Sequence, residues 1–314
     1  MATVAPTSRM IQEQDDRVRT RRSWAYGLIA AVIWGGFLVA SRHAIGAGLH
    51  PTDLAFLRYL VAGAILLPWF VRRSPHRLGG MGWRKGVTLA VLAGPLFVIV
   101  SSSGYRFAPL AHGAVIQLGM LTLVSILLAA VFVGERPGKR RIVGILVIIA
   151  GLAVAAGQGL MAGSPTAWVG DLLFATAGSM WALFTVLQRR WTIAPLSATA
   201  VVSVLSAAVY VPAYLAENGL RLFASASPAM LVEQILVQGV LSGVIALFAF
   251  ARAVQNLGAG RAALFPALAP GVAMLIGIPV TGEIPTAIQI LGLLILSGGL
   301  LIAVRGDPAA SNRR

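Results

Sequence analysis

The chain has 314 residues, of which 58% are apolar and 11% are charged, whereas a soluble domain has about 25% charged residues. So few charges cannot cover a water-soluble globule of this size, which argues against a soluble enzyme. The chain has 0 Cys, which excludes disulfides, thiol nucleophiles and cysteine-ligated metal sites. Its net charge of +15 is compatible with a nucleic-acid partner, and the positions of the basic residues decide that question below.

Ten apolar segments follow one another along the chain, each near the length of about 20 residues that a helix needs to cross a bilayer. Charged residues are scarce within them, as expected where burying one charge costs several kcal/mol. In lipid each segment must satisfy its own backbone hydrogen bonds. The sequence therefore predicts an all-α integral membrane protein with ten transmembrane helices. The predicted spans are residues 24–42, 54–71, 86–104, 111–133, 142–161, 168–188, 196–216, 230–251, 260–281 and 286–304.

Basic residues gather on one side of these predicted spans. Of the 25 Lys and Arg residues, 21 fall in segments on the side of the two termini, 3 fall on the opposite side and Arg58 lies within a span. Segments rich in Lys and Arg stay in the cytoplasm, so we expect both termini to be cytoplasmic and the protein to lie in the plasma membrane, the inner membrane of a bacterium. The basic charge is thus a topology signal, and no nucleic-acid partner is expected.

The two halves of the chain share a pattern. Gly-Glu-x-Pro occurs with its glutamate at Glu135 and again at Glu283, and in both copies glycines follow nine and sixteen residues after the glutamate. These glycines, seven residues apart on one helix face, predict close packing between helices. They are Gly144 and Gly151 in the first copy and Gly292 and Gly299 in the second.

Each repeat holds five predicted spans, so two tandem copies must insert with opposite orientations. Inverted repeats of this kind are a hallmark of secondary transporters. The expected organisation is a polar, disordered cytoplasmic tail over 1–23, repeats over 24–161 and 168–304, and a second cytoplasmic tail over 305–314.

With these features the sequence resembles the drug/metabolite transporter superfamily, in particular its EamA type with ten helices in two inverted five-helix repeats. The resemblance covers about residues 24–304. It implies a carrier that moves small metabolites, often amino acids and commonly outward, and not an enzyme. The motifs that carry it are Trp34-Gly35-Gly36, Arg58, Gly134-Glu135 with Gly144 and Gly151, Gly170-Asp171-Leu172, Trp181-Ala182, Pro270, and Gly282-Glu283 with Gly292 and Gly299.

Four residues are candidates for substrate binding. Arg58 offers a guanidinium fork for an anionic group, although pairing with Asp53 is an alternative. Trp34 and Trp181 lie near the middles of their spans at corresponding positions of the two repeats, where they could flank a central cavity or simply pack helices. Gln117 needs a polar partner in hydrocarbon and should face the bundle interior.

The repeat endings supply structural candidates. Glu135 and Glu283 are interpreted as structural signature residues at the membrane interface, because a carboxylate there can accept backbone N–H bonds, with proton coupling as the alternative. Pro266 and Pro270 should bend the ninth span and so shape a gate. Thr122 replaces the proline expected in the first repeat, so we expect a straighter fourth span.

Three further expectations concern the ends of spans. Thr286 and Gln289 have the spacing of a helix capping box. His112 is expected to be hydrated near a loop. Asp171 is expected to stabilise the start of its helix, with ion coupling as the weaker alternative.

The sequence therefore predicts a secondary transporter of small metabolites that works by alternating access, with an intramembrane enzyme or a channel-like facilitator as alternatives. The expected partners are a small-molecule substrate and the lipid bilayer, and a homodimer is left open. No metal site or cofactor is expected. Substrate identity, transport direction and coupling ion are not encoded in these patterns.

Overall fold

The computed structural model describes residues 6–73, 78–133, 138–161, 165–257, 262 and 264–305, and this part of the chain folds as helices and connections with no β-strand. The predicted all-α class is thus confirmed. Seven helices run unbroken: α1 (Pro6–Gly46), α2 (Pro51–Val71), α7 (Lys139–Met161), α8 (Ala167–Arg190), α9 (Pro195–Asn218), α14 (Leu264–Thr281) and α15 (Ala287–Arg305).

Three other paths consist of shorter pieces joined end to end. The first is α3 (Trp83–Ala93) with α4 (Pro95–Gly104). The second is α5 (Leu110–His112), the π-helix η2 (Gly113–Gln117) and α6 (Leu118–Val133). The third is α11 (Pro228–Gln234), the π-helix η3 (Ile235–Ile245) and α12 (Ala246–Leu257), and it follows the short α10 (Arg221–Ser225).

Eight helices or joined helix paths of the described chain are long and apolar enough to cross a membrane, and Ala287–Ala303 is apolar but shorter. The protein is therefore a multi-pass membrane protein, whereas the predicted number of ten spans is not confirmed. The eight are Thr20–Gly46, Pro51–Val71, Trp83–Gly104, Leu110–Leu128, Ala167–Arg190, Pro195–Asn218, Pro228–Leu257 and Leu264–Thr281.

The N-terminal segment differs from the prediction. Most of residues 1–23 was expected to be disordered because it is polar, yet α1 begins at Pro6 and continues without a break to Gly46. Between Pro6 and the first span the sequence contains no further Gly or Pro, so nothing in it interrupts the helix. A helix already formed by the first span can propagate backward at little cost, because only nucleation is expensive.

Local sequence signals mark where the helices begin. Proline stands in the first positions of α2, α4, α9 and α11, where its missing N–H leaves no hydrogen bond unmade. At the start of α15, the backbone N–H of Thr286 donates to Gln289 Oε1 at 2.9 Å, and that of Gln289 donates to Thr286 Oγ1 at 3.3 Å. The predicted capping box is therefore confirmed.

The bends predicted from proline account for only some of the irregular positions within the helices. Pro270 lies inside α14, whereas Pro266 lies in the first turn of that helix, where proline removes no intrahelical bond. The fourth path, expected to be straighter because of Thr122, contains the π-helix η2 ahead of that residue. A π-segment inserts its extra residue without proline, so the proline pattern could not reveal it.

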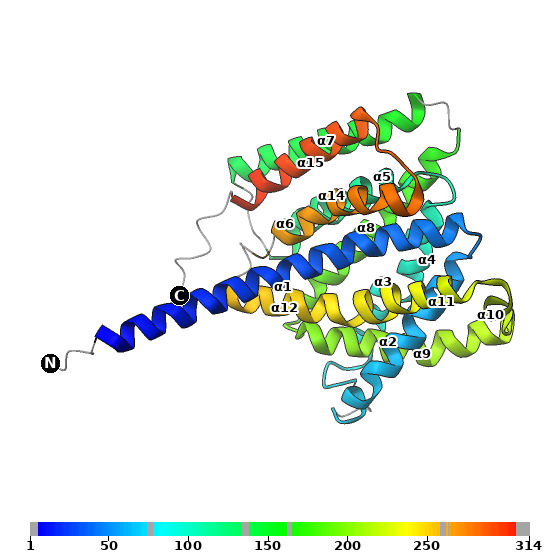
Figure 1. Cartoon of the computed structure of the whole chain (residues 1–314), viewed down its shortest axis with the longest axis horizontal. Helices are drawn as coiled ribbons and strands as arrows, with labels where there is room; N and C mark the ends of the chain where they lie inside the picture. Colours follow the sequence, from blue (N-terminus) through cyan, green and yellow to red (C-terminus); the bar gives the residue numbers. More distant parts are fainter. Residues whose placement is uncertain are drawn as a thin grey trace.

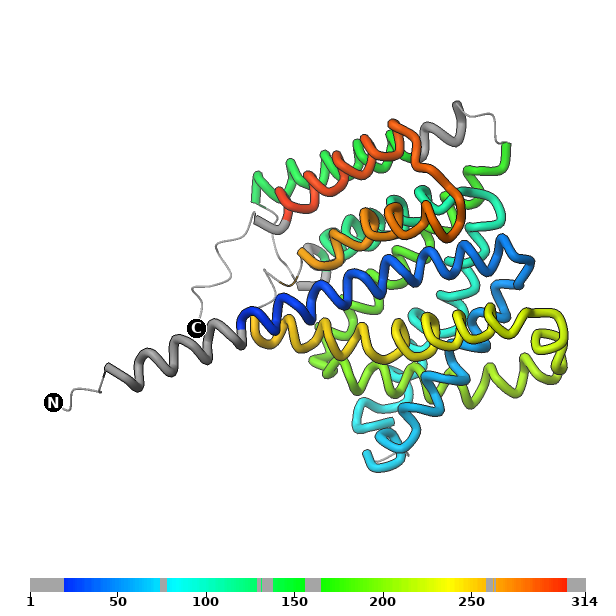
Figure 2. Tube along the Cα trace, in the orientation of Figure 1, coloured from blue at the N-terminus to red at the C-terminus, as the bar shows by residue number. Residues whose placement is uncertain are grey.

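The helices pack in a pattern that repeats between the two halves. α1 packs against α14 and α12, and α8 packs correspondingly against α6 and against α3 and α4. α2 packs against α9, and α7 against α15. Each of the first five helical paths therefore packs against the second half as its counterpart among the last five packs against the first half. Figures 1 and 2 show α1 lying between α12 and α14, and α7 beside α15 at one side of the bundle.

The α7–α15 pair is held by the predicted glycine faces, which are thus confirmed as packing faces. A Cβ on Gly151 would lie 2.7 Å from the backbone N of Leu296, and one on Gly299 would lie 2.7 Å from the backbone N of Ile148. Such separations leave no room for a side chain. Because apolar area alone does not drive association in lipid, this close backbone approach is what stabilises the pair.

Candidate functional site

Polar and charged side chains concentrate at one end of the bundle. We call this the distal end, defined by the connections 47–50, 105–109, 219–227 and 282–286. The opposite, proximal end has the described connecting residues 72–73, 78–82 and 191–194 (Figure 1). Among residues with described side chains, all the carboxylates lie near the distal end. They are Asp53, Asp171, Glu217, Glu233 and Glu283.

At the distal end of the described chain, four contacts between a basic and an acidic side chain each join the first half of the chain to the second. They are Arg42–Glu283, His43–Glu233, His112–Asp171 and Arg221–Asp53. Because each pair fastens a helix of one half to a helix or connection of the other, the two halves cannot separate at this end while the pairs remain formed.

Glu283 connects three elements. Arg42 Nε of α1 donates to Glu283 Oε1 at 2.5 Å, and the backbone N–H of Leu110 donates to Glu283 Oε2 at 2.7 Å. Arg42 also donates to the carbonyl oxygen of Tyr105 at 2.7 Å. Burial raises the pKa of the Tyr105 phenol well above its ordinary value, so this residue stays neutral beside the pair. The carboxylate thus receives the backbone N–H bond proposed for it from the sequence.

Asp53 does not pair with Arg58, which corrects the alternative raised from their spacing. Its carboxylate accepts hydrogen bonds from the Tyr214 hydroxyl, from Arg221 Nη2 at 3.2 Å and from the backbone N–H of His50 at 2.8 Å. These three bonds cap α2 and fasten α9 and α10 to it.

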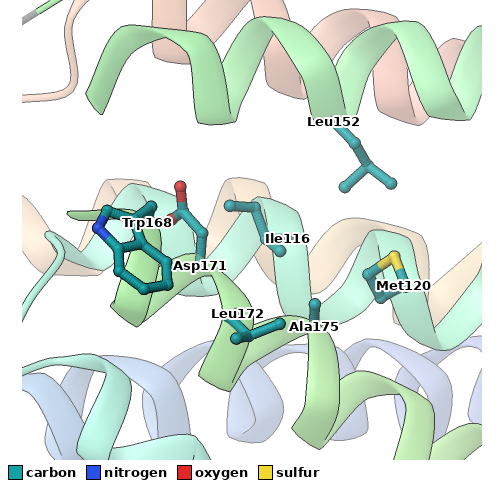
Figure 3. A pocket seen from close by; sticks show the side chains of 7 residues that line it. All are labelled: Ile116, Met120, Leu152, Trp168, Asp171, Leu172 and Ala175. Atoms are coloured by element: carbon teal, nitrogen blue, oxygen red, sulfur yellow. The ribbon is translucent and has the colours of Figure 1, made fainter. Parts of the chain in front are cut away.

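His112 is buried, contrary to the expected hydrated position. Its side chain is 3% exposed, and its Nδ1 lies 2.7 Å from Asp171 Oδ1 of α8. Asp171 also lines a pocket of about 360 Å³, with Ile116, Met120, Leu152, Trp168, Leu172 and Ala175. Figure 3 shows Leu152 reaching from α7 toward the side chains of α8 and of η2 and α6. Because Trp168 and Leu172 are 58% and 59% exposed, this pocket opens sideways toward lipid.

Arg58 of α2 lies deep between the two halves. It is 6% exposed, and its Nη1 donates to Ser242 Oγ of η3 at 3.1 Å. Its guanidinium lies over the rings of Phe37 and Tyr59, with 5.2 Å and 6.0 Å to their centroids. Within the described residues it forms no ion pair, so it is a buried positive charge without a carboxylate.

A stripe of buried polar side chains on α11 and η3 leads from the distal end to Arg58. We call Gln234, Gln238 and Ser242 the polar stripe; each is at most 4% exposed. Gln234 Nε2 donates to the carbonyl oxygen of Ala40 at 3.2 Å, and Gln238 Nε2 donates to Ser41 Oγ at 3.0 Å. The stripe thus faces α1. Sequence reasoning missed it, although its spacing of four residues is a signal that could have revealed it.

Gln117 faces the bundle interior, as predicted. It is 5% exposed, and its Oε1 accepts a hydrogen bond from Ser101 Oγ of α4 at 2.7 Å. It ends the π-helix η2, just as Gln238 and Ser242 lie within η3. Both π-segments therefore carry buried polar side chains, and π-segments are frequent at functional sites because they redirect side chains.

Trp34 and Trp181 occupy corresponding places in the two halves. Trp34 of α1 contacts Phe250 of α12 edge to face, with ring centroids 5.1 Å apart, and Trp181 of α8 contacts Phe97 of α4 at 4.9 Å. Neither tryptophan lines the pocket beside Asp171 or a smaller one of about 170 Å³ around Glu283 and Gln289. Both therefore pack helices together in this conformation.

The remaining sequence candidates are placed as follows. Glu135 lies outside the described residues, so the structure describes no counterpart of Glu283 in the first half. In the described parts of the chain, no group of three or more His, Asp or Glu side chains stands close enough to hold a metal ion.

Comparison with known proteins identifies two matching segments. The sequence model of the EamA-like transporter family matches residues 22–157 and again residues 168–305. Together the two matches cover most of the chain and divide it where the packing pattern repeats.

Several curated relatives carry transporter names. YyaM of Bacillus subtilis, an uncharacterized transporter, is 23% identical over 283 residues, covering 87% of this chain and 90% of that protein. YedA of Escherichia coli, an uncharacterized inner membrane transporter, is 24% identical over 282 residues, 88% of each chain. An uncharacterized transporter of Archaeoglobus fulgidus is 26% identical over 167 residues, and the match spans only 55% of that protein.

A solved structure shares the fold. A crystal structure that is 19% identical in sequence superposes with a TM-score of 0.60, covering 93% of this chain and 99% of its own. At that identity the likeness concerns the arrangement of the helices alone.

Proposed function

We propose that this chain, which belongs to the EamA-like transporter family, is a secondary carrier that exports a small metabolite by alternating access. The observation that supports this mechanism best is the set of four contacts between basic and acidic side chains that join the two halves at the distal end of the described chain. A carrier needs such a reversible closure on one side of its cargo.

The proposal includes ten membrane spans in two inverted repeats. α7 and α15 are proposed as the fifth and tenth spans, because they pack on each other along their glycine faces and each ends one matched segment. Five spans per repeat reverse the second copy relative to the first. Two five-span repeats of opposite orientation are consistent with the packing pattern that repeats between the halves.

The proposed orientation places the proximal end in the cytoplasm. Lys and Arg residues crowd its connections, whereas the described carboxylates lie at the distal end, as the positive-inside rule requires. The name of YedA, an inner membrane transporter, supports the bacterial inner membrane as the location. The ion pairs then form an outer closure, and cargo enters from the cytoplasm.

The proposed cargo is an amino acid or a related small metabolite. The proposed contacts are Arg58, Gln117, Trp34 and Trp181. Arg58, Trp34 and Trp181 each contact the opposite half, and Gln117 is buried against Ser101 of its own half. Pro270, inside α14, leaves one carbonyl of its helix without an intrahelical donor. This favours bending of α14 where the two halves move, and Pro266 sets the start of the same helix.

Counterflow in proteoliposomes tests the carrier. Vesicles with the purified chain are loaded with unlabelled amino acids or N-acetyl amino acids, and the labelled compound is added outside at low concentration. A carrier gives transient accumulation of label and saturates as concentration rises, because each cycle moves one bound molecule. Flux that rises linearly without accumulation would identify a channel-like facilitator instead. Vesicles without protein are the control.

A further inference from the structure

We propose that the cargo is a small monocarboxylate that has a hydrogen-bond donor beside its carboxylate and no cationic group, and that Arg58 binds the carboxylate. This rests on the carrier function proposed above and narrows its substrate class from amino acids and related metabolites to acids that lack a free ammonium group. Three observations on the described residues support it: an uncompensated buried cation, a buried acceptor without a donor, and the absence of a carboxylate where a cargo ammonium group would sit.

The first observation is the charge balance of Arg58. A guanidinium has five N–H donors, and its side-chain partners in the described chain are two neutral hydroxyl groups, those of Ser242 and Tyr59, with no ion pair. Burying a charge without a counterion costs several kcal/mol. Asp53, the acid nearest in sequence, pairs with Arg221 and accepts from Tyr214 and His50, and not from Arg58. The remaining edge of the guanidinium therefore suits a carboxylate from outside the chain, bound through two parallel hydrogen bonds.

The second observation is the amide of Gln238. Its Nε2 donates to Ser41 Oγ at 3.0 Å and to Gln234 Oε1 at 3.3 Å, whereas its Oε1 is buried and has no hydrogen-bond partner among the described residues. The Ser41 hydroxyl donates to the carbonyl oxygen of Phe37 at 2.8 Å, which fixes its oxygen as the acceptor and so fixes the amide orientation. A buried acceptor left unpaired costs about 1–3 kcal/mol. An N–H or O–H of the cargo would remove that cost.

The two groups lie on one helix face. Gln238 is four residues before Ser242, which bonds Arg58, and this is about one turn of η3. The donor for the carboxylate and the acceptor for the neighbouring N–H are thus one turn apart. A small acid with an amide or hydroxyl on the carbon next to its carboxylate carries the two complementary groups side by side.

The third observation concerns what the site lacks. The aromatic faces of Phe37 and Tyr59 that could attract an ammonium already face the guanidinium of Arg58. The described carboxylates nearest along α2 and α11, Asp53 and Glu233, are paired with Arg221 and His43. A cargo ammonium would therefore be repelled by Arg58 without any compensating partner. A net-negative acid is favoured over a zwitterion.

Thermal stabilisation of the purified full-length chain tests the class. The probes are a set of N-acetyl-L-amino acids, the matching N-acetyl-L-amino amides and the free amino acids. The acid and amide of each pair differ mainly in charge. We expect at least one acid to raise Tm by several degrees, and its amide and its free amino acid to have no effect.

Variants assign the binding to Arg58. Arg58→Gln should abolish stabilisation by the acid, and Arg58→Lys, which keeps the charge and loses the fork, should weaken binding about tenfold or more. The matched control is Arg106→Gln, an exposed distal-end arginine, which should bind as the wild type does. If Arg58→Gln does not fold, the lysine variant and the comparison of acid with amide on the wild type still test whether Arg58 binds the carboxylate.

Several outcomes would overturn the inference. These are equal stabilisation by acids and amides, equal stabilisation by the free amino acid, unchanged binding to the folded Arg58 variants, or no stabilisation of the wild type by any acid. The carrier proposal survives each of these if another compound shows saturable counterflow. It fails separately if counterflow is absent for every compound that binds.

Discussion

Glu283→Gln is expected to open the distal end and to raise the labelling rate of a cysteine introduced at Ser41 by about tenfold. Glu283 is a part-buried carboxylate that accepts from Arg42 at 2.5 Å and from the backbone of Leu110 at 2.7 Å. Charge-assisted bonds of this kind contribute about 1.5–3 kcal/mol each, and one factor of ten corresponds to about 1.4 kcal/mol. Neutralising the carboxylate should therefore shift the equilibrium away from the closed state.

The measurement uses a membrane-impermeant maleimide added from the outer side. The chain has 0 Cys, so Ser41→Cys gives a single reporter without background, and Ser41 is 0% exposed in the closed arrangement. Glu217→Gln is the matched control, because Glu217 is an exposed distal-end carboxylate without a described ion pair. Equal labelling in the two variants would show that the Glu283 pair does not hold the distal end closed.

Gly299→Val is expected to destabilise the protein strongly, with most of the purified material lost as aggregate and a Tm lower by many degrees. The Cβ of any side chain at this position would lie 2.7 Å from the backbone N of Ile148 and 3.0 Å from the carbonyl oxygen of Gly144. Backbone atoms cannot rotate away as a side chain can, so α7 and α15 would have to separate. Overpacking typically costs about 1–3 kcal/mol even where neighbours can shift.

The adjacent Gly298→Val provides the control for this prediction. No heavy atom lies within 4 Å of a Cβ built on Gly298, and both positions belong to α15, so the change in helix propensity is the same. We expect Gly298→Val to elute as a single species with nearly wild-type Tm in detergent. Similar losses in both variants would mean that close backbone contact with α7 is not what stabilises this pair.

The sequence predicted those features that depend on residue type and spacing within one segment. Apolar length located the membrane helices, because the bilayer imposes that length whatever the neighbours are. The spacing of Gly292 and Gly299 predicted a packing face, and Thr286 with Gln289 predicted a capping box. In each case the interacting groups are near in sequence or need only a small residue on one helix face.

The partners of the buried polar residues could not be predicted in the same way. Arg58 meets Ser242 across 184 positions of the chain, and Gln238 meets Ser41 across 197, so spacing carries no trace of either contact. His112 was expected to be hydrated because it stands near a loop, but tertiary packing buries it against Asp171. The π-segments η2 and η3 also escaped prediction, since one inserted residue changes no composition pattern.

The buried charge of Arg58 has a consequence for how membrane potential would act on the proposed cycle. With a monocarboxylate bound the site is electrically neutral, and when empty it carries one positive charge. Exchange of cargo for cargo would then be insensitive to voltage. Net export would move one negative charge outward and gain about 2.3 kcal/mol per 100 mV of an inside-negative potential. That potential alone could drive export, and the return of the empty carrier would be the step that senses it.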